Sequence, residues 1–493
     1  MSDSDSNVIS DEMALNYHLM HPGGDSAPGD PNVAFCLDGT YHLHYILSHP
    51  WRDGNSFSFV HVTSEDMLHW QWQPTTLQPS FTGHGMFSGT GLLTREGRPA
   101  AIYCGVSDPR HTFLALATDR RLSGWEKPYP LVPRGGPGGR DVGLLYDPDG
   151  FLFEGTYYAY SAEQGLPLCR SKDLVAWQYV GPVLSHDLPE VALGEDLSCA
   201  NLFPLDGRWM LLCISHSMGC RYYIGDWDAR AEQFVPERHG RMNWRRPGQS
   251  LIEPAYRDFF APESVLTADG RRVMWAWLTT VHPELERKSL QSLPRELSLD
   301  PDGTLRIHPL RELESLRYDG FTLENQVVGA PTAEGAAPPK TVHLADIEVD
   351  AFEVRIRIDR DEADRKRLGF LLFSGEGTEG LPVILCPESG TLCVGQTEAP
   401  FAVAELPDGE DVELRLFADK YLVEVFVNGR QAALTAHMAY REGQSLKAYV
   451  FPGIFPHDRQ TTTIRRVDIW KLKPTHQGFF EARENRIWAP DLA

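Results

Sequence analysis

Apolar runs, cysteines and targeting signals are scarce in this chain of 493 residues. No stretch approaches the roughly 20 consecutive apolar residues of a membrane-spanning helix. The N-terminus, MSDSDSNVISDEM, lacks the basic start and apolar run of a secretory signal. The 8 cysteines form no CxxC pair, so we expect reduced, mostly buried thiols and no zinc site. The prediction is a cytoplasmic protein without a metal or organic cofactor.

Basic residues are also in deficit. The 46 Lys and Arg stand against 68 Asp and Glu, which gives a net charge of −22. Non-specific binding to a nucleic-acid backbone or to an anionic membrane needs a basic surface, so both are disfavoured as partners. The sequence also lacks a Gly-rich phosphate loop, HExxH, GxSxG and the dinucleotide fingerprint. The reactions that depend on these motifs are therefore disfavoured.

A degenerate repeat organises the first part of the chain. Five times, an acidic residue and a glycine lead into a short apolar or aromatic run, which is typical of a tight turn that enters a β-strand. The five instances begin at Asp38, Glu96, Glu154, Asp206 and Asp269. A second element lies between them and closes on a tryptophan, at Trp70, Trp125 and Trp177. The recurring order predicts a five-bladed β-propeller, and an array of β-sandwiches with coincidental turns is the alternative.

The pattern stops near Leu310, and this change predicts the domain boundaries. A Gly-, Ala- and Pro-rich stretch, GAPTAEGAAPPK, is typical of a linker, and alternating strands such as FEVRIRID and YLVEVFVNG follow it. We predict an all-β chain with a propeller over residues 1–310, a linker over 311–340, a β-sandwich over 341–474 and a tail over 475–493.

Three acidic clusters are candidates for chemistry, because the inner strands of a propeller converge on one axis. They are Asp30 in GDPN, Asp141 in GGRDVGLLYD, and Glu195 with Asp196 in GEDLSCANLFPL. Each alone is equally consistent with a turn, a surface ion pair or a solvated loop. Together they indicate a glycosidase, because two carboxylates that flank a glycosidic bond suffice for its hydrolysis.

The chain resembles glycoside hydrolase family 32, the invertases and fructan hydrolases. The ordered matches are GDPN with YHLHY, SEDMLHWQWQP, FSGTG, GRDV, DLSCANLFPL, DFFAPES, LPRELSL and YLVEVFVNG. The resemblance implies a five-bladed propeller followed by a sandwich. It also implies retaining cleavage of terminal β-D-fructofuranosides, with sucrose, a sucrose derivative or a short fructan as the small carbohydrate substrate.

The resemblance also implies roles for individual residues. Asp30 would be the nucleophile that forms a fructosyl-enzyme. Asp141 with Arg140 would bind fructose hydroxyls and steady the transition state, although the family's Arg-Asp-Pro reads Arg-Asp-Val here. The fructose pocket would be shaped by Asn32, Phe87 and Ser88.

The main departure from the family lies at the acid/base residue. The family has Glu directly before the Cys, where this chain has Ser198. Strict strand alternation places Asp196 on the face of Ser198, whereas a β-bulge would present Glu195. We favour Glu195 as the acid because its side chain is longer, and Asp196 then contributes to substrate binding. A fructosyltransferase and a non-catalytic fructan-binding protein remain the alternatives, and the sequence leaves the oligomeric state open.

Overall fold

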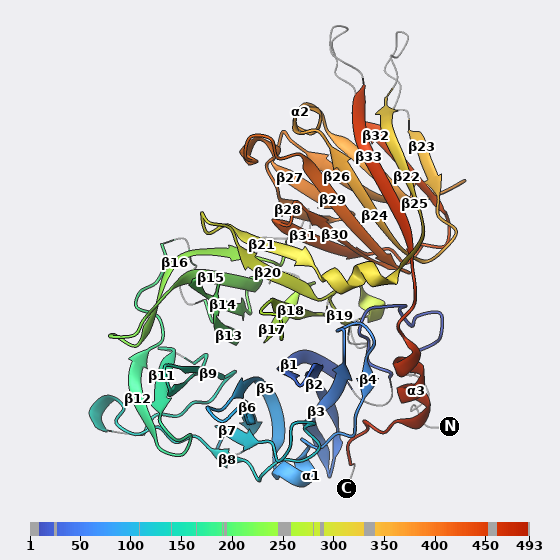
Figure 1. Ribbon diagram of the computed structural model, residues 1–493. Helices are drawn as coiled ribbons and strands as arrows, with labels where there is room; N and C mark the ends of the chain where they lie inside the picture. The colour runs from blue at the N-terminus through green and yellow to red at the C-terminus, as the bar shows by residue number, and fades with distance from the viewer. Residues whose placement is uncertain are drawn as a thin grey trace.

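The computed structural model describes residues 9–491, except 24–26, 108, 140, 164, 190, 192–194, 245–257, 280, 286–289, 330–340 and 452–460. In this part of the chain the fold is an all-β propeller followed by a β-sandwich, which confirms the predicted fold class (Figure 1). The eight cysteines are free thiols. None of the helices described is both long enough and apolar enough to cross a membrane.

Five antiparallel sheets follow one another along the propeller. The first two sheets are β1 (Ala27–Leu37), β2 (Thr40–Trp51), β3 (Gly54–Ser64) and β4 (Gln71–Trp72), then β5 (Gly85–Leu93), β6 (Pro99–Val106), β7 (His111–Leu116) and β8 (Tyr129–Pro130). The next two are β9 (Asp149–Phe153), β10 (Thr156–Tyr160), β11 (Pro167–Ser171) and β12 (Trp177–Pro182), then β13 (Ser198–Leu205), β14 (Arg208–Ser215), β15 (Gly219–Asp228) and β16 (Gln233–Arg241). The last is β17 (Phe260–Leu266), β18 (Arg272–Leu278), β20 (Arg295–Leu299) and β21 (Leu305–Pro309), with β19 (Leu290–Gln291) beside β18.

The first strand of each sheet lines the axis of the propeller. These inner strands contact one another in the order β1, β5, β9, β13 and β17, and β17 returns to β1. Each sheet is a meander that starts at the axis, so the inner strands run in the same direction. Residues at the beginnings of the inner strands therefore meet at one end of the axis.

The repeated acidic residue and glycine form the first turn of each sheet. The glycines have φ values from 71° to 87°, a left-handed conformation that glycine adopts without a steric penalty. They are Gly39, Gly97, Gly155, Gly207 and Gly270. The turn prediction is confirmed at all five positions.

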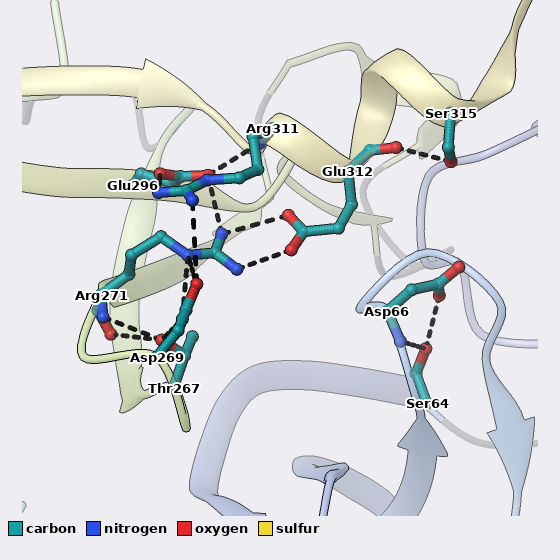
Figure 2. Close-up of polar contacts among 9 residues, drawn as sticks. All are labelled: Ser64, Asp66, Thr267, Asp269, Arg271, Glu296, Arg311, Glu312 and Ser315. Carbon is teal, nitrogen blue, oxygen red and sulfur yellow. Dashed lines mark hydrogen bonds and ion pairs between the residues drawn. The ribbon is translucent and has the colours of Figure 1, made fainter.

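The second repeated element is a turn capped by an aspartate. Asp66, Asp119 and Asp173 each accept two backbone N–H groups from the residues that follow them. Figure 2 shows Ser64 bonded to Asp66 in the first of these turns. The tryptophans that close the elements are buried at Trp70, Trp125 and Trp177. The aspartate carboxylate accepts hydrogen bonds from the backbone N–H groups of the turn, and the buried tryptophan ring packs against the core.

Two six-stranded sheets form the sandwich. One contains, in spatial order, β22 (Arg317–Val328), β33 (Thr462–Leu472), β24 (Ala351–Ile358), β29 (Val412–Asp419), β30 (Leu422–Val427) and β31 (Gln431–Ala436). The other contains β23 (Val342–Asp346), β32 (Ser445–Val450), β25 (Leu368–Ser374), β26 (Leu381–Cys386), β27 (Thr391–Val394) and β28 (Thr397–Pro400). The helices are α1 (Pro79–Thr82), α2 (Arg360–Ala363), α3 (Gln477–Asn485), η2 (Pro137–Gly139), η3 (Pro283–Leu285), η4 (Arg311–Leu316) and η5 (Val403–Glu405).

The segments predicted as linker and tail both contain regular structure. Within the linker, β22 pairs with β33 and forms an edge strand of the sandwich. Most of its side chains are exposed, so it lacks the apolar alternation that marks a strand in the sequence. Residues 330–340 lie outside the described residues. Within the tail, α3 buries Phe479 and Ala482, and the Phe479 ring lies 6.3 Å from that of Trp72 in the first sheet.

An ion-pair network ties η4 to the last propeller sheet (Figure 2). Arg271 donates to Asp269 at 2.9 Å, to Glu296 at 2.8 Å and to Glu312 of η4 at 2.6 Å. The backbone N–H of Arg311 also donates to Glu296. Ion pairs between η4 and the last propeller sheet therefore stabilise the junction between the two domains.

A second junction is buried and involves the N-terminal segment. The backbone N–H of His18 donates to Asp419, and its ring contacts both Asp419 and Glu424 of the sandwich. Glu424 also accepts hydrogen bonds from Arg295 and from the Leu293 N–H of the propeller. Three segments distant in sequence meet at these two carboxylates.

Candidate active site

Carboxylates from different sheets meet where the inner strands begin. Asp30 lies near the start of β1, Ser88 in β5, and Asp147 two residues before β9. Cys199 is the second residue of β13. All four lie at the same end of the axis, as the direction of the inner strands requires.

Cys199 joins the two carboxylates of this cluster. Its Sγ lies 3.6 Å from Asp30 Oδ2 and 3.7 Å from Asp147 Oδ2. Ser88 Oγ donates to Asp30 Oδ2 at 3.3 Å and lies 3.7 Å from the same sulfur. The cluster is buried apart from Cys199, which is half-buried.

Backbone irregularities aim these side chains at the axis. Positive φ values occur at Asp147 (39°), Cys199 (46°) and Ala261 (46°), close to the beginnings of inner strands, and at Val33 (42°) within β1. Register shifts interrupt β1, β5, β13 and β17 in the same region. Such bulges re-aim side chains and are frequent beside active sites, and the strain costs on the order of 1–3 kcal/mol per residue.

The local electrostatics raise the pKa of both carboxyl groups. Burial is the main cause at Asp30, and the nearby charge of Asp147 adds to it, so the pKa rises from 3.8 to about 7. Burial also raises the pKa of Asp147. A carboxyl group whose ionisation is disfavoured by burial and by a second acid is typical of functional sites.

Asn32 and Phe87 support the cluster. Asn32 Nδ2 donates to the Asp30 carbonyl at 2.9 Å, and Asn32 Oδ1 accepts the Gly89 N–H at 2.6 Å. These bonds tie the bulge of β1 to that of β5. Phe87 is half-buried, and its ring packs edge-on against Phe57 at 5.2 Å. The structure therefore brings Asp30, Asn32, Phe87 and Ser88 into one region.

Of the predicted pair Arg140 and Asp141, only Asp141 belongs to the described residues, and its side chain is exposed and not buried in this cluster. Asp147, which the sequence reasoning missed, occupies the cluster instead. A usable signal was present, because Asp147-Pro148 repeats the Asp30-Pro31 dipeptide and directly precedes an inner strand.

Glu195 is engaged away from the cluster. Its carboxylate forms an ion pair with Arg221, and the two side chains are 2% and 3% exposed. The Arg221 guanidinium lies over the Tyr223 ring and contacts His239. The bulge that would have presented Glu195 lies after Ser198, where it turns Cys199 toward Asp30 and Asp147.

Asp196 lies at the rim of the cluster. It accepts hydrogen bonds from Ser198 Oγ at 2.6 Å and from the His216 N–H at 2.9 Å. The ring Nδ1 of His216 lies 2.6 Å from Asp196 Oδ2, the oxygen that also accepts from Ser198. Burial raises the pKa of Asp196, but these hydrogen bonds outweigh burial and lower it to about 2. Asp196 is therefore a carboxylate at neutral pH.

A second pair of buried acids lies farther along the axis. Asp149 accepts the Leu202 N–H, and Glu263 accepts hydrogen bonds from Thr90 and from the Ser264 N–H. Burial raises their pKa values to about 7 and about 8. A cavity of about 390 Å³ opens beside Asp149. Thr90 follows Ser88 on the same inner strand, so this pair lies deeper than Asp30.

Comparisons with known proteins cover nearly the whole chain. A sequence profile described as the N-terminal domain of glycosyl hydrolases family 32 matches residues 26–309. A second, described as the C-terminal part of the same family, matches residues 312–471. The sucrose-6-phosphate hydrolase of Klebsiella pneumoniae is 29% identical over 466 residues, which span 87% of this chain and 89% of that protein.

Solved structures share the fold at lower identity. The sucrose-6-phosphate hydrolase from Lactobacillus gasseri superposes with a TM-score of 0.72, at 18% identity and over 96% of both chains. A variant of the β-fructofuranosidase of Bombyx mori in complex with sucrose gives 0.69, at 20% identity and over 95% of both chains. These similarities extend over the propeller and the sandwich together.

Proposed function

The chain belongs to glycosyl hydrolases family 32, and we propose that it is a retaining glycosidase that releases terminal β-D-fructofuranosyl groups through a fructosyl-enzyme intermediate on Asp30. The observation that carries the proposal is the buried contact of Asp30 with Ser88 and Cys199, beside the second carboxyl group of Asp147. This is an arrangement of converging acids from separate sheets, and it suits the chemistry of the family.

Asp30 acts as the nucleophile in the proposed mechanism. Ionised Asp30 attacks the anomeric carbon, and the oxocarbenium-like transition state develops positive charge next to Asp147. Asp147 then takes the role that the sequence assigned to Asp141, because it lies in the cluster and Asp141 is exposed. Its negative charge stabilises the transition state, and its carboxylate can accept a hydrogen bond from a fructose hydroxyl.

Sucrose and sucrose 6-phosphate are the proposed test substrates. A fructoside is favoured by the names of the curated relatives, which include sucrose-6-phosphate hydrolases and an invertase. Hydrolysis and transfer to another sugar differ only in the acceptor, so product analysis separates them. Equal release of glucose and fructose from sucrose indicates hydrolysis, whereas fructose-containing oligomers in place of free fructose indicate transfer.

A pair of matched variants tests the site. We expect Asp30→Asn and Asp147→Asn to lower kcat/KM on sucrose by roughly 10³-fold or more, because each removes a charge that acts in the transition state. Asp141→Asn is the control for Asp147→Asn, because it makes the same chemical change at an exposed side chain six positions before Asp147. We expect it to stay within about two-fold of the unmodified protein.

The opposite pattern would reject the site. Loss of activity in Asp141→Asn with retention in Asp147→Asn would return the role to Asp141. An unmodified protein that binds fructosides but cleaves neither substrate would favour the binding-protein alternative.

A further inference from the structure

Ser198 leaves the proposed reaction without the family's proton donor. The family has Glu at this position, directly before the Cys, and a serine hydroxyl is far too weak an acid to protonate a leaving group at neutral pH. This inference rests on the proposed function, in which Asp30 attacks a fructoside. The question is which side chain supplies the proton.

The carboxylate of Asp196 occupies the space in front of Ser198. Ser198 Oγ donates to Asp196 Oδ2 at 2.6 Å. A glutamate at position 198 would carry its carboxylate about one hydrogen-bond length beyond the position of the serine oxygen. Asp196 therefore supplies a negative charge near the point where the family's glutamate would supply one.

Among the described residues, Asp196, Glu195 and Glu263 do not suit proton donation. Asp196 has a pKa of about 2 because its hydrogen bonds outweigh burial, so it is ionised at neutral pH. Glu195 is committed to its buried ion pair with Arg221. Glu263 has a raised pKa, but it is bonded to Thr90, deeper along the axis than Asp30.

His216 lies at the rim beside Ser198. It follows β14, in which Ile214 pairs with Ser198, and its ring lies 6.0 Å from that of Phe260 at the start of β17. The imidazole thus lies close to the beginnings of two neighbouring inner strands, β13 and β17. Its Nδ1 lies 2.6 Å from Asp196, and its side chain is 55% exposed, so a substrate can reach it.

An imidazole oriented by a carboxylate is a common unit of general acid–base catalysis. The carboxylate fixes the ring and stabilises its protonated form. We propose that His216, held by Asp196, donates and accepts the proton in place of the family's glutamate.

The proposed steps conserve atoms and charge. As Asp30 bonds to the anomeric carbon, the bond from that carbon to the leaving oxygen breaks, and His216 Nε2 gives its proton to this oxygen. A water molecule then attacks the same carbon while neutral Nε2 takes one of its protons. The bond to Asp30 breaks, which restores the carboxylate and the imidazolium. Asp196 stays ionised throughout.

The dependence on the leaving group tests this role. Glucose in sucrose is a poor leaving group that needs a proton, whereas 4-nitrophenolate departs without one. We expect His216→Gln to lower kcat on sucrose by roughly 10²–10⁴-fold, but the first step on 4-nitrophenyl β-D-fructofuranoside by less than about 10-fold. Asp196→Asn should show the same pattern more weakly, and it serves as the second variant if His216→Gln does not fold. His186→Gln, a change at an exposed histidine outside the cluster, is the matched control.

Two rescue experiments add readouts that a structural role would not change. Azide needs no general base, so it should restore turnover of the aryl fructoside by His216→Gln and yield a β-fructosyl azide. Introducing Ser198→Glu into the His216→Gln background should recover part of the activity on sucrose, because it restores the family's acid.

The outcomes separate this inference from the proposed function. The inference is overturned by equal losses of His216→Gln on both substrates without azide rescue, or by the leaving-group pattern appearing in Glu195→Gln instead. If Asp30→Asn keeps full activity on both substrates, the proposed function fails first, and the inference fails with it. If Asp30→Asn is inactive while His216→Gln behaves like the control, only the inference fails.

Discussion

Buried His18 should make the stability of the protein depend on pH. Its Nδ1 lies 2.8 Å from Asp419 and its Nε2 lies 3.4 Å from Glu424, and all three side chains are shielded from solvent. Burial lowers the pKa of His18, but the two carboxylates together outweigh burial and raise it from 6.5 to about 9. The folded state therefore holds this proton more tightly than the unfolded chain does.

The magnitude follows from the shift in pKa. A rise from 6.5 to about 9 corresponds to about 3 kcal/mol, at 1.36 kcal/mol per pKa unit. This contribution is complete below pH 6.5 and disappears as the pH rises to about 9. The pKa values of Asp419 and Glu424 are lowered, so their own contributions vanish only in acid. Asp30, Asp149 and Glu263 also have raised pKa values, so the His18 contribution is isolated by comparing the unmodified protein with a His18 variant, in which these acids are unchanged.

Urea-induced unfolding, followed by tryptophan fluorescence from pH 6 to 9.5, measures this effect. We expect the difference in unfolding free energy between the unmodified protein and His18→Gln to shrink by about 3 kcal/mol across this range. His69→Gln is the control, because this histidine also pairs with an aspartate, Asp66, but is 56% exposed. A His18→Gln difference that stays constant with pH would refute the reasoning.

Further expectations concern Asp30 and two charge networks. The acid limb of kcat/KM should have its midpoint near pH 7, because Asp30 has a pKa of about 7 and must lose its proton to attack; a midpoint near pH 4 would contradict its burial. Glu195→Gln should lower the unfolding free energy by about 3–5 kcal/mol, because it leaves the charge of Arg221 buried and unpaired; a loss below about 1 kcal/mol in urea unfolding would show that the pair is not buried. Arg271→Met should lower the unfolding free energy by about 2 kcal/mol in the same assay. Arg120→Met, which removes an exposed ion pair, should lower it by less than about 0.5 kcal/mol. Equal losses in the two variants would show that the network does not stabilise the domain junction.

The fold could be predicted from local signals that recur. The turn at Asp38 and Gly39 needs a residue in the left-handed backbone conformation, and the same turn recurs in every sheet of the propeller. The repeat can therefore be recognised in the amino-acid sequence. The edge strand Arg317–Val328 gave no such signal, because backbone pairing with Thr462–Leu472 defines it while its side chains face solvent.

The candidate site was predicted in part. Asp30 was named from its Asp-Pro-Asn sequence before an expected strand and Ser88 from the family resemblance, and in the structure the two side chains are in contact. The choice of Asp141 over Asp147 followed the Arg-Asp motif, whereas position relative to the inner strand decides which acid reaches the axis. The proposed role of His216 could not be predicted from the sequence, because its contact with Asp196 depends on how β13 and β14 pair.

The most direct test of the account is to trap the fructosyl-enzyme. Turnover of sucrose is stopped with acid within the first cycles, the protein is digested, and the peptides are examined by mass spectrometry. The account predicts one fructosyl residue attached to the peptide that contains Asp30, and its absence in Asp30→Asn. An adduct on a different carboxylate, or release of α-fructose as the first product, would contradict it.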